Sequence, residues 1–251
     1  MQISKIGWKT VQFFLAIVFI LLSWWIFALL LETPAFPPPL EAFTSFFKSM
    51  QGDMLLHLRI SFYRVAASLL MAAVLGIPAG LFLGKNPHID QYISPVIYLT
   101  YPIPKVVFLP VLLILLGIGD LSKVVLIALI VFYQILVTTR DAARNLQTEY
   151  IVSVKSLGAN SLELYRHVYL PGCLPAILTS LRLGLGTALA VLFLTETYAT
   201  SKGIGYFIMY SWSSMAYDKM FAGIIAMGLM GFLLYIFLDG CERYLCSWLN
   251  P

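Results

Sequence analysis

Charged residues are scarce in this sequence. Only 11% of its 251 residues are Asp, Glu, Lys or Arg, whereas 60% are apolar, and the mean hydropathy is +0.88. Soluble globular chains carry roughly 25% charged residues. A fold of this length has too small an interior to hide the surplus apolar side chains, so lipid must cover much of its surface. A cytosolic enzyme, a secreted disulfide scaffold and a disordered segment are therefore excluded.

Residues that carry chemistry are also few and scattered. The three cysteines, Cys173, Cys241 and Cys246, are an odd set without metal-ligand spacing, so we expect no disulfide framework and no metal site. The sequence contains no H-E-x-x-H and no G-x-S-x-G, and the run 80–85 has the wrong spacing for a phosphate-binding loop. The net charge of +4 is too small and too dispersed for nucleic acid. We expect no catalytic residue and no ATP site in this chain.

Long uncharged runs are plentiful instead. Runs of about 18 or more apolar residues indicate transmembrane helices, and six such regions are expected. They are Thr10–Leu31, Val65–Gly84, Val106–Gly119 with the lead-in Gln91–Pro104, Val124–Thr139, Leu174–Tyr198, which Arg182 and Glu196 interrupt, and Met220–Leu238. The predicted fold class is an all-α polytopic membrane protein with one transmembrane domain over residues 1–251. An even number of spans places both termini on the same side.

Lysine and arginine indicate which side that is, because cytoplasmic segments of membrane proteins carry the excess of basic residues. With the N-terminus in the cytoplasm, nine basic residues are inside and six are outside. The inner set is Lys5, Lys9, Lys85, Arg140, Arg144, Lys155, Arg166, Arg182 and Arg243, and the outer set is Lys48, Arg59, Arg64, Lys123, Lys202 and Lys219. We therefore expect cytoplasmic termini in the inner (plasma) membrane, with Arg59 and Arg64 reaching water from the mouth of the second span.

Two loops stand out from the short connections. The external loop 32–53 begins with four prolines, which predict an extended chain leading into a short amphipathic stretch. The inner loop 141–172 is the only long polar segment and has helical spacing on both sides of Gly158. We expect Gly158 to adopt a left-handed backbone between two short helices, with Asn160 or Ser161 as the N-cap of the second. An elaborated loop of this kind indicates a docking partner.

Lys105 lies at membrane depth beside prolines. It follows Pro102 and Pro104, and Pro110 comes soon after, so the third span is broken three times within nine residues. Broken backbone at this depth is tolerated only where protein or a water-filled cavity covers it. The pattern favours a segment that lines a passage, and the alternative is a structural kink with a snorkelling lysine.

Glu196 is another ionisable residue within a predicted span, near the outer end of that span. Such residues mark functional sites because burying them is costly. Glu196 either lines a pathway, or latches against a basic partner such as Lys202, or is wetted or hydrogen-bonded by its neighbours Thr195 and Thr197. Gly203 and Gly205 allow a sharp turn nearby, and we expect residues 196–206 to form the outer rim of the protein.

The 141–172 loop resembles a known motif. Lys155-Ser-Leu-Gly158-Ala159-Asn160, with Leu170-Pro171 twelve residues after the glycine, is similar to the EAA loop of binding-protein-dependent ABC importer permeases. Where that family has Glu-Ala-Ala, this chain has Val152-Ser153-Val154, and the nearest acid is Glu149. The departure favours apolar contact over a salt bridge at this docking surface.

Further segments resemble one subfamily, the permeases for nitrate, taurine, sulfonates and bicarbonate. These segments are Pro37–Ala42, Pro102–Lys105 with Leu109-Pro110, Gly117–Lys123, and Glu196 with Gly203–Tyr206. The resemblance covers most of the chain.

The resemblance implies a type I ABC importer permease that works in a complex. Two copies, usually identical, enclose one translocation route, two ATPase subunits that bind ATP and Mg²⁺ dock beneath, and an external binding protein delivers a small solute, such as nitrate, bicarbonate or a sulfonate. The implied coupling residues are Lys155, Leu157, Gly158, Ala159, Leu170 and Pro171. The pathway or gate candidates are Pro102, Pro104, Lys105, Glu196, Gly203 and Gly205.

Other classes of membrane protein lack support in the sequence. A stand-alone channel would show a filter of acidic residues or carbonyls. A secondary transporter would show an internal repeat and a coupling acid near the middle of the membrane. An intramembrane enzyme would show a catalytic constellation. We find none of these patterns clearly in the sequence.

Overall fold

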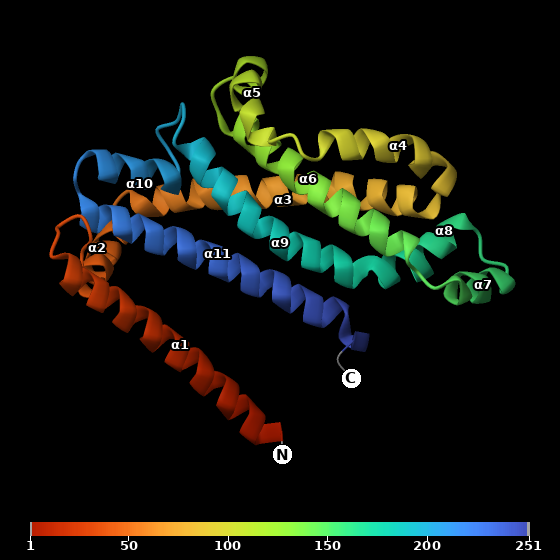
Figure 1. Ribbon diagram of the computed structural model, residues 1–251, viewed down its shortest axis with the longest axis horizontal. Coiled ribbons are helices and arrows are strands. Elements are labelled where there is room, and N and C mark those ends of the chain that lie inside the picture. The colour runs from red at the N-terminus through yellow and green to blue at the C-terminus, as the bar shows by residue number, and fades with distance from the viewer. Residues whose placement is uncertain (1, 250–251) are drawn as a thin grey trace.

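The computed structural model describes residues 2–249 of the chain, and within that range every regular element is helical (Figure 1). The helices are α1 (Gln2–Leu31), α2 (Pro39–Met50), α3 (Met54–Lys85), α4 (Pro87–Thr100), α5 (Leu109–Leu116), α6 (Asp120–Arg144), α7 (Thr148–Ser156), α8 (Ser161–Leu164), α9 (Leu170–Glu196), α10 (Ile204–Ser213) and α11 (Tyr217–Leu245). Single tighter or wider turns occupy Lys105–Phe108, Tyr165–Tyr169 and Ser247–Leu249. The predicted all-α fold class is confirmed.

Five stretches of the described chain are long and apolar enough to cross a membrane: Val11–Leu31, Met54–Lys85, Asp120–Arg144, Ser161–Glu196 and Tyr217–Leu245. A sixth span exists only if α4 and the segment Lys105–Leu116 count as one, because the two are bent by 80°. The predicted third region, 106–119 with its lead-in 91–104, is thus a bent pair of helical segments, and the predicted break by prolines is confirmed. Pro102 and Pro104 lie in the break and have no backbone N–H to continue α4.

The centre of the bundle is built from α3, α6 and α9. Helix α3 packs along α6, and α9 contacts both (Figure 1). Their shared core includes Val65, Leu69, Ile127, Val131 and Leu192, which are buried. Apolar residues at helical spacing on three helices thus meet in one layer.

Small residues allow the closest of these contacts. The glycines of α3 face α6, and a Cβ added at Gly80 would lie 2.7 Å from the Cβ of Thr139. At Gly76 the added atom would lie 3.0 Å from Ile135. Side chains at Gly76 and Gly80 would push the two helices apart, so these small residues permit the close packing of α3 on α6.

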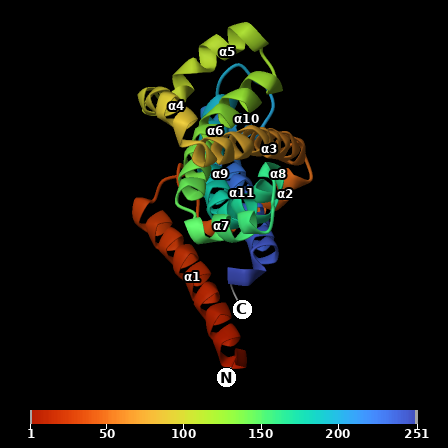
Figure 2. The same ribbon diagram turned by 90° about the vertical axis from the view of Figure 1, so that its right-hand side faces the viewer.

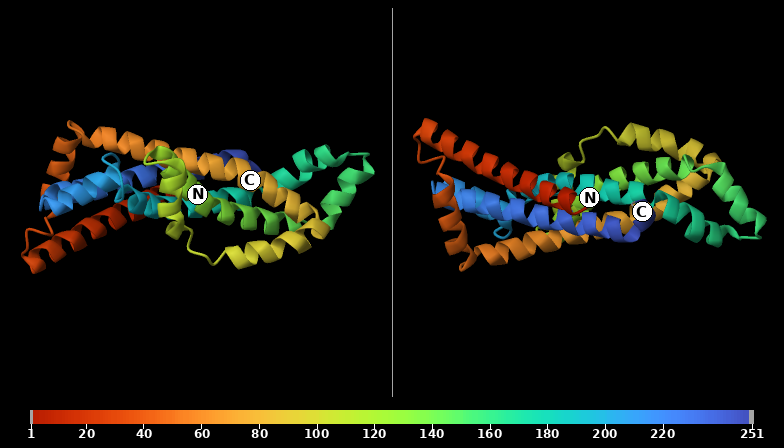
Figure 3. Two further views of the ribbon diagram at one scale, coloured as in Figure 1. Left: turned by 90° about the horizontal axis from the view of Figure 1, so that it is seen from above. Right: turned by 90° about the horizontal axis from the view of Figure 1, so that it is seen from below.

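The remaining helices lie around this centre. Helix α11 packs on α9, α2 and α10, whereas α1 lies beside the bundle, and Trp24 stacks on Phe221 with ring centroids 5.5 Å apart. Figure 2 shows α1 on one side and α4 with α5 on the other. Both views in Figure 3 place α7 and α8 at one end of the molecule and α2 and α10 at the opposite end.

Candidate functional site

The 141–172 loop folds as the sequence predicts. Gly158 lies between α7 and α8 with a φ of +85°, the left-handed region that favours glycine. A Cβ added there would meet nothing within 4 Å, so the backbone conformation, and not lack of space, requires glycine.

Asn160 is the N-cap of α8. Its side-chain oxygen accepts from the N–H groups of Leu162 and Glu163 at 2.9 and 3.0 Å. The Glu163 carboxylate in turn accepts from the Asn160 N–H at 2.6 Å, which completes a capping box. Asn160 and not Ser161 is therefore the cap, and the turn at Gly158 is followed by a fixed helix start.

The tip of this loop is apolar and exposed. Leu157 is 86% exposed and Leu162 is 75% exposed, and Tyr150 and Val152 on α7 are more than half exposed. No residue of α7 is buried. We call Tyr150, Val152, Leu157 and Leu162 the apolar tip.

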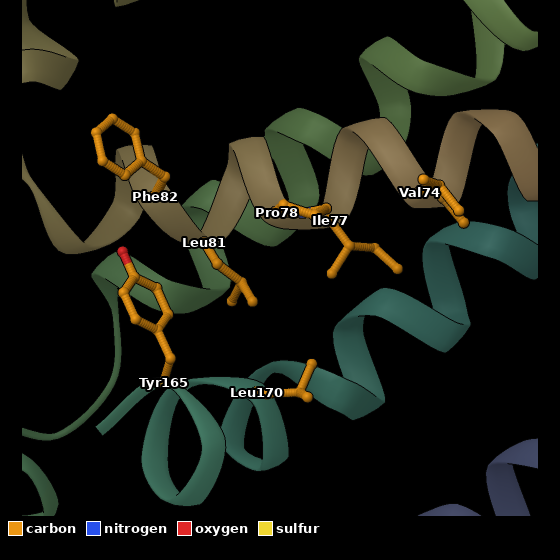
Figure 4. A pocket seen from close by; sticks show the side chains of 8 residues that line it. Val74, Ile77, Pro78, Leu81, Phe82, Tyr165 and Leu170 are labelled. Atoms are coloured by element: carbon orange, nitrogen blue, oxygen red, sulfur yellow. The ribbon is translucent and has the colours of Figure 1, made fainter. Parts of the chain in front are cut away.

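The predicted coupling residues separate into two groups. Lys155, Leu157, Gly158 and Ala159 lie together at the tip, whereas Leu170 and Pro171 begin α9. Leu170 lines an apolar pocket of about 750 Å³ between α3 and the start of α9 (Figure 4). The Leu-Pro pair thus starts the transmembrane helix and does not contribute to the tip.

One contact that joins the loop to the bundle had no sequence signal. Lys85, at the end of α3, donates from Nζ to the Ser161 hydroxyl. The same ammonium lies 4.0 Å from the centre of the Tyr165 ring. Long-range pairing of this kind depends on tertiary structure, and it links α3 directly to α8.

At the opposite end of the bundle, the Glu196 carboxylate is fully buried. It accepts hydrogen bonds from Arg64 Nη1 at 2.7 Å, from the Ser61 hydroxyl at 2.8 and 2.9 Å, and from the Gly205 N–H at 2.8 Å. Three donors from two other helices therefore compensate the loss of water around its charge.

The Arg64 guanidinium connects a second acid to this group. It is 3% exposed and donates to Asp120 Oδ1 from Nε at 2.8 Å and from Nη2 at 2.6 Å. Its Nη1 also donates to the backbone carbonyl of Lys202 at 3.0 Å. We call Ser61, Arg64, Asp120 and Glu196 the Arg64–Glu196 cluster, and it joins α3, α6 and α9.

Three sequence expectations about this cluster need correction. Arg64 is buried and paired and does not reach water. Lys202 contributes its backbone carbonyl and not its ammonium. The hydroxyls of Thr195 and Thr197 donate to backbone carbonyls one turn earlier and do not contact Glu196.

Gly203 and Gly205 are needed because the chain folds tightly over Glu196. Gly203 has a φ of +119°, and a Cβ there would overlap the Glu196 carboxyl group. A Cβ at Gly205 would lie 2.8 Å from the Glu196 Cβ. The Gly203 N–H donates to His57 Nδ1 at 3.0 Å, which fixes the turn against α3. Glu196, Gly203 and Gly205 therefore belong together, as their spacing suggests.

Pro102, Pro104 and Lys105 lie elsewhere, at the break between α4 and α5. The Lys105 ammonium turns back onto this break and donates to the carbonyls of Thr100 at 2.8 Å and Tyr101 at 2.5 Å. These carbonyls end α4, and the prolines that follow cannot supply N–H donors. Lys105 is 9% exposed and lines a pocket of about 400 Å³, so it does not snorkel to the interface.

A third set of charges fixes the other end of α4. Asp90 is buried and lies 3.6 Å from Arg140 Nε and 3.5 Å from Arg144 Nη1. Arg140 also pairs with Asp141 at 3.0 Å. The sequence analysis treated these arginines only as cytoplasmic charge, because an acid so far away along the chain gives no local signal.

We expect Glu196→Gln to destabilise the protein strongly. The substitution leaves Arg64 buried with one carboxylate fewer, and breaking a buried ion pair typically costs about 3–5 kcal/mol. The thermal midpoint of the purified protein in detergent measures the loss. Glu41→Gln on α2, an exposed carboxylate, is the matched control and should leave the midpoint unchanged. Equal midpoints for the two variants would contradict the assigned role of Glu196.

Comparison with known proteins agrees with this architecture. The family model described as "Binding-protein-dependent transport system inner membrane component" matches residues 76–248. The taurine transport system permease protein TauC of Escherichia coli is 33% identical over 237 residues, which cover 91% of this chain and 86% of that protein. The putative aliphatic sulfonates transport permease protein SsuC of Bacillus subtilis is 31% identical over 80% of this chain and 73% of that protein.

The fold has a counterpart among solved structures. The crystal structure of a bacterial ABC transporter involved in the import of the acidic polysaccharide alginate matches with a TM-score of 0.65 and 17% identity, over 96% of each chain. That likeness concerns the fold alone. The family match and the identity to TauC establish the rest: this chain belongs to the inner membrane components of binding-protein-dependent transport systems, and it is a multi-pass permease subunit of an ABC importer.

Proposed function

We propose that this permease imports a small organic sulfonate, as one of two copies that enclose the route. Two ATPase subunits dock on the cytoplasmic side, and an external binding protein delivers the solute. The observation that carries the proposed docking of the ATPase subunits is the apolar tip, because it is exposed on the loop that joins α6 to α9. Members of this family are not themselves ATPases, so the energy must enter through such a contact.

The apolar tip is the proposed ATPase contact. Leu157 and Leu162 flank the fixed turn at Gly158 and project from it with most of their surface exposed. Val152-Ser153-Val154 takes the place of the acid found in the motif, so burial of leucine and valine is the main source of affinity. Full burial of one such side chain contributes about 1.5–3 kcal/mol.

Helix α3 is the proposed connection between the two ends. It has 32 residues and is therefore about 48 Å long. Lys85 at one end holds α8, and Ser61 and Arg64 near the other end hold Glu196 and the 196–205 turn. Pro78 lies inside α3, but the close packing of Gly76 and Gly80 on α6 holds the helix on both sides of it, so a tilt imposed at the loop moves the outer turn as well.

The proposed function also assigns each end of the bundle to one side of the membrane. The 141–172 loop faces the cytoplasm, together with both termini, and the end with α2 and α10 faces the binding protein. Figure 3 supports this arrangement by placing α7 and α8 at the end opposite α2 and α10. The nine-to-six distribution of basic residues in the sequence points the same way.

The substrate class comes from the relatives. The two described above are named for taurine and for aliphatic sulfonates, at 33% and 31% identity. We therefore propose a sulfonate rather than nitrate or bicarbonate for this chain.

Uptake into proteoliposomes tests the function. We expect the chain, reconstituted with its ATPase and binding protein, to accumulate labelled taurine only when ATP is present on the side of the ATPase. The chain alone should neither hydrolyse ATP nor admit taurine. Flux through the chain alone, or uptake driven by an ion gradient without ATP, would favour a channel or a secondary transporter.

Gly158→Val should uncouple the complex. A left-handed backbone costs a residue with a side chain about 1–2 kcal/mol, which is small compared with folding but similar to the roughly 1–3 kcal/mol typical of coupling between sites. We expect the complex to assemble while its ATP hydrolysis no longer responds to loaded binding protein. Gly158→Asn is the control, because asparagine tolerates this conformation, and it should retain most stimulation. Normal stimulation in Gly158→Val would refute the coupling role of the turn.

A further inference from the structure

We propose that Lys105 and the pocket around it bind the sulfonate group of the solute within the membrane. The inference rests on the proposed function, a sulfonate importer, and it assigns the contact in the permease that recognises the anion. The pocket lies at the break between α4 and α5, against the middle of α6.

The first argument is the missing counter-ion. Four cationic side chains are buried in the described part of the chain: Arg64, Lys105, Lys123 and Arg140. Arg64 pairs with Glu196 at 2.7 Å and Arg140 with Asp141 at 3.0 Å. Within this part of the chain Lys123 makes no ion pair, but the negative charges of Asp120 and Glu196 stabilise its ammonium group.

Lys105 and Lys123 both lack an ion pair with a carboxylate in the described range 2–249, and of these two only Lys105 lines one of the described pockets. A buried charge without a counter-ion is costly, particularly at membrane depth. An anion that enters the pocket would remove this cost, so the site favours anionic over neutral solutes.

The second argument is the unused capacity of the ammonium group. Lysine has three N–H donors, and the carbonyls of Thr100 and Tyr101 accept two of them. The ring of Tyr133 lies 4.2 Å from Nζ and that of Tyr101 lies 5.3 Å away, so aromatic faces hold the cation in position. The third donor is left for a ligand oxygen, and a sulfonate offers three acceptor oxygens.

The third argument is the size and lining of the pocket. Its volume of about 400 Å³ is within the range of small-molecule sites. Ile103 and Val106 supply apolar wall, and Tyr133 and Gln134 supply polar groups from α6. Gln134 is itself held by a hydrogen bond from Nε2 to Thr187 on α9 at 3.1 Å, so two central helices fix this wall.

The position suits transport. Ile130–Gln134 lie midway along α6, whose ends carry the Arg64–Glu196 cluster and the Arg140–Asp90 pair. A site between two charged clusters lies near the middle of the span, where alternating access requires the solute to rest. A bound anion also neutralises the Lys105 ammonium group, whose charge is costly to keep away from water.

Lys105→Met tests the site in the complete transporter with labelled taurine as probe. We expect maximal taurine uptake to fall at least tenfold while ATP hydrolysis stimulated by binding protein stays within twofold of wild type. Lys105→Arg keeps the charge and should restore a substantial part of uptake. Arg243→Met, an exposed basic residue in the last turn of α11 and outside the pocket, should match wild type. Unchanged uptake in Lys105→Met would overturn the site, and absence of taurine uptake in wild type would overturn the proposed function instead.

Protection of an introduced thiol distinguishes recognition from a structural role of Lys105. Ile103 lines the pocket and is 42% exposed, so Ile103→Cys should react with a neutral thiol reagent. We expect millimolar taurine to slow this reaction at least threefold when Lys105 is present, and to leave it unchanged in the double variant that also carries Lys105→Met. Ile118→Cys, at a position 76% exposed and outside the pocket, is the control and should show no protection. Equal reaction rates of the Ile103→Cys variant with and without taurine would refute the proposal.

Discussion

The ion pair between Arg64 and Glu196 is the interaction on which the rest of this structure depends. Both side chains are withdrawn from water, so each charge is tolerated only because the other is present. To bring them together, α3 must lie against α9, the turn after α9 must fold over the carboxylate, and that turn must carry glycine at 203 and 205. Asp120 extends the same constraint to the start of α6. One buried pair thus fixes three membrane-spanning helices and the turn that leads into α10.

The second constraint is the length of α3. The helix runs from the Arg64–Glu196 cluster to Lys85, and Lys85 holds the start of α8 next to the apolar tip. The close packing at Gly76 and Gly80 joins α3 to α6 as one body. We propose that this packing connects movements of the loop mechanically with movements of the opposite end, and the Lys105 pocket lies against α6 between them. On this proposal, ATP that binds to the ATPase subunits can move a permease that has no ATP site of its own.

The sequence alone predicted the local features well and the long-range ones poorly. The apolar runs, the left-handed Gly158 and the cap at Asn160 each depend on neighbours within a few residues, and the structure confirms them. The partner of Glu196 lies 132 residues away, and no periodicity marks it. The prolines indicated a break near Lys105, but the 80° bend and the return of the ammonium onto α4 depend on packing against α6. Residues from distant segments can be paired only once the helices are placed.

The central claim is that the apolar tip and the Arg64–Glu196 cluster act as one unit through α3. A double-mutant cycle in the reconstituted complex tests it most directly, with Lys85→Met at one end of α3 and Glu196→Gln at the other, and with stimulation of ATP hydrolysis by loaded binding protein as the readout. The free-energy effects of substitutions at independent, distant sites add up. The effects of substitutions at two connected sites should therefore not be additive. The account predicts that the double variant loses no more stimulation than the more damaging single variant. Losses that multiply would show two independent sites and contradict the account.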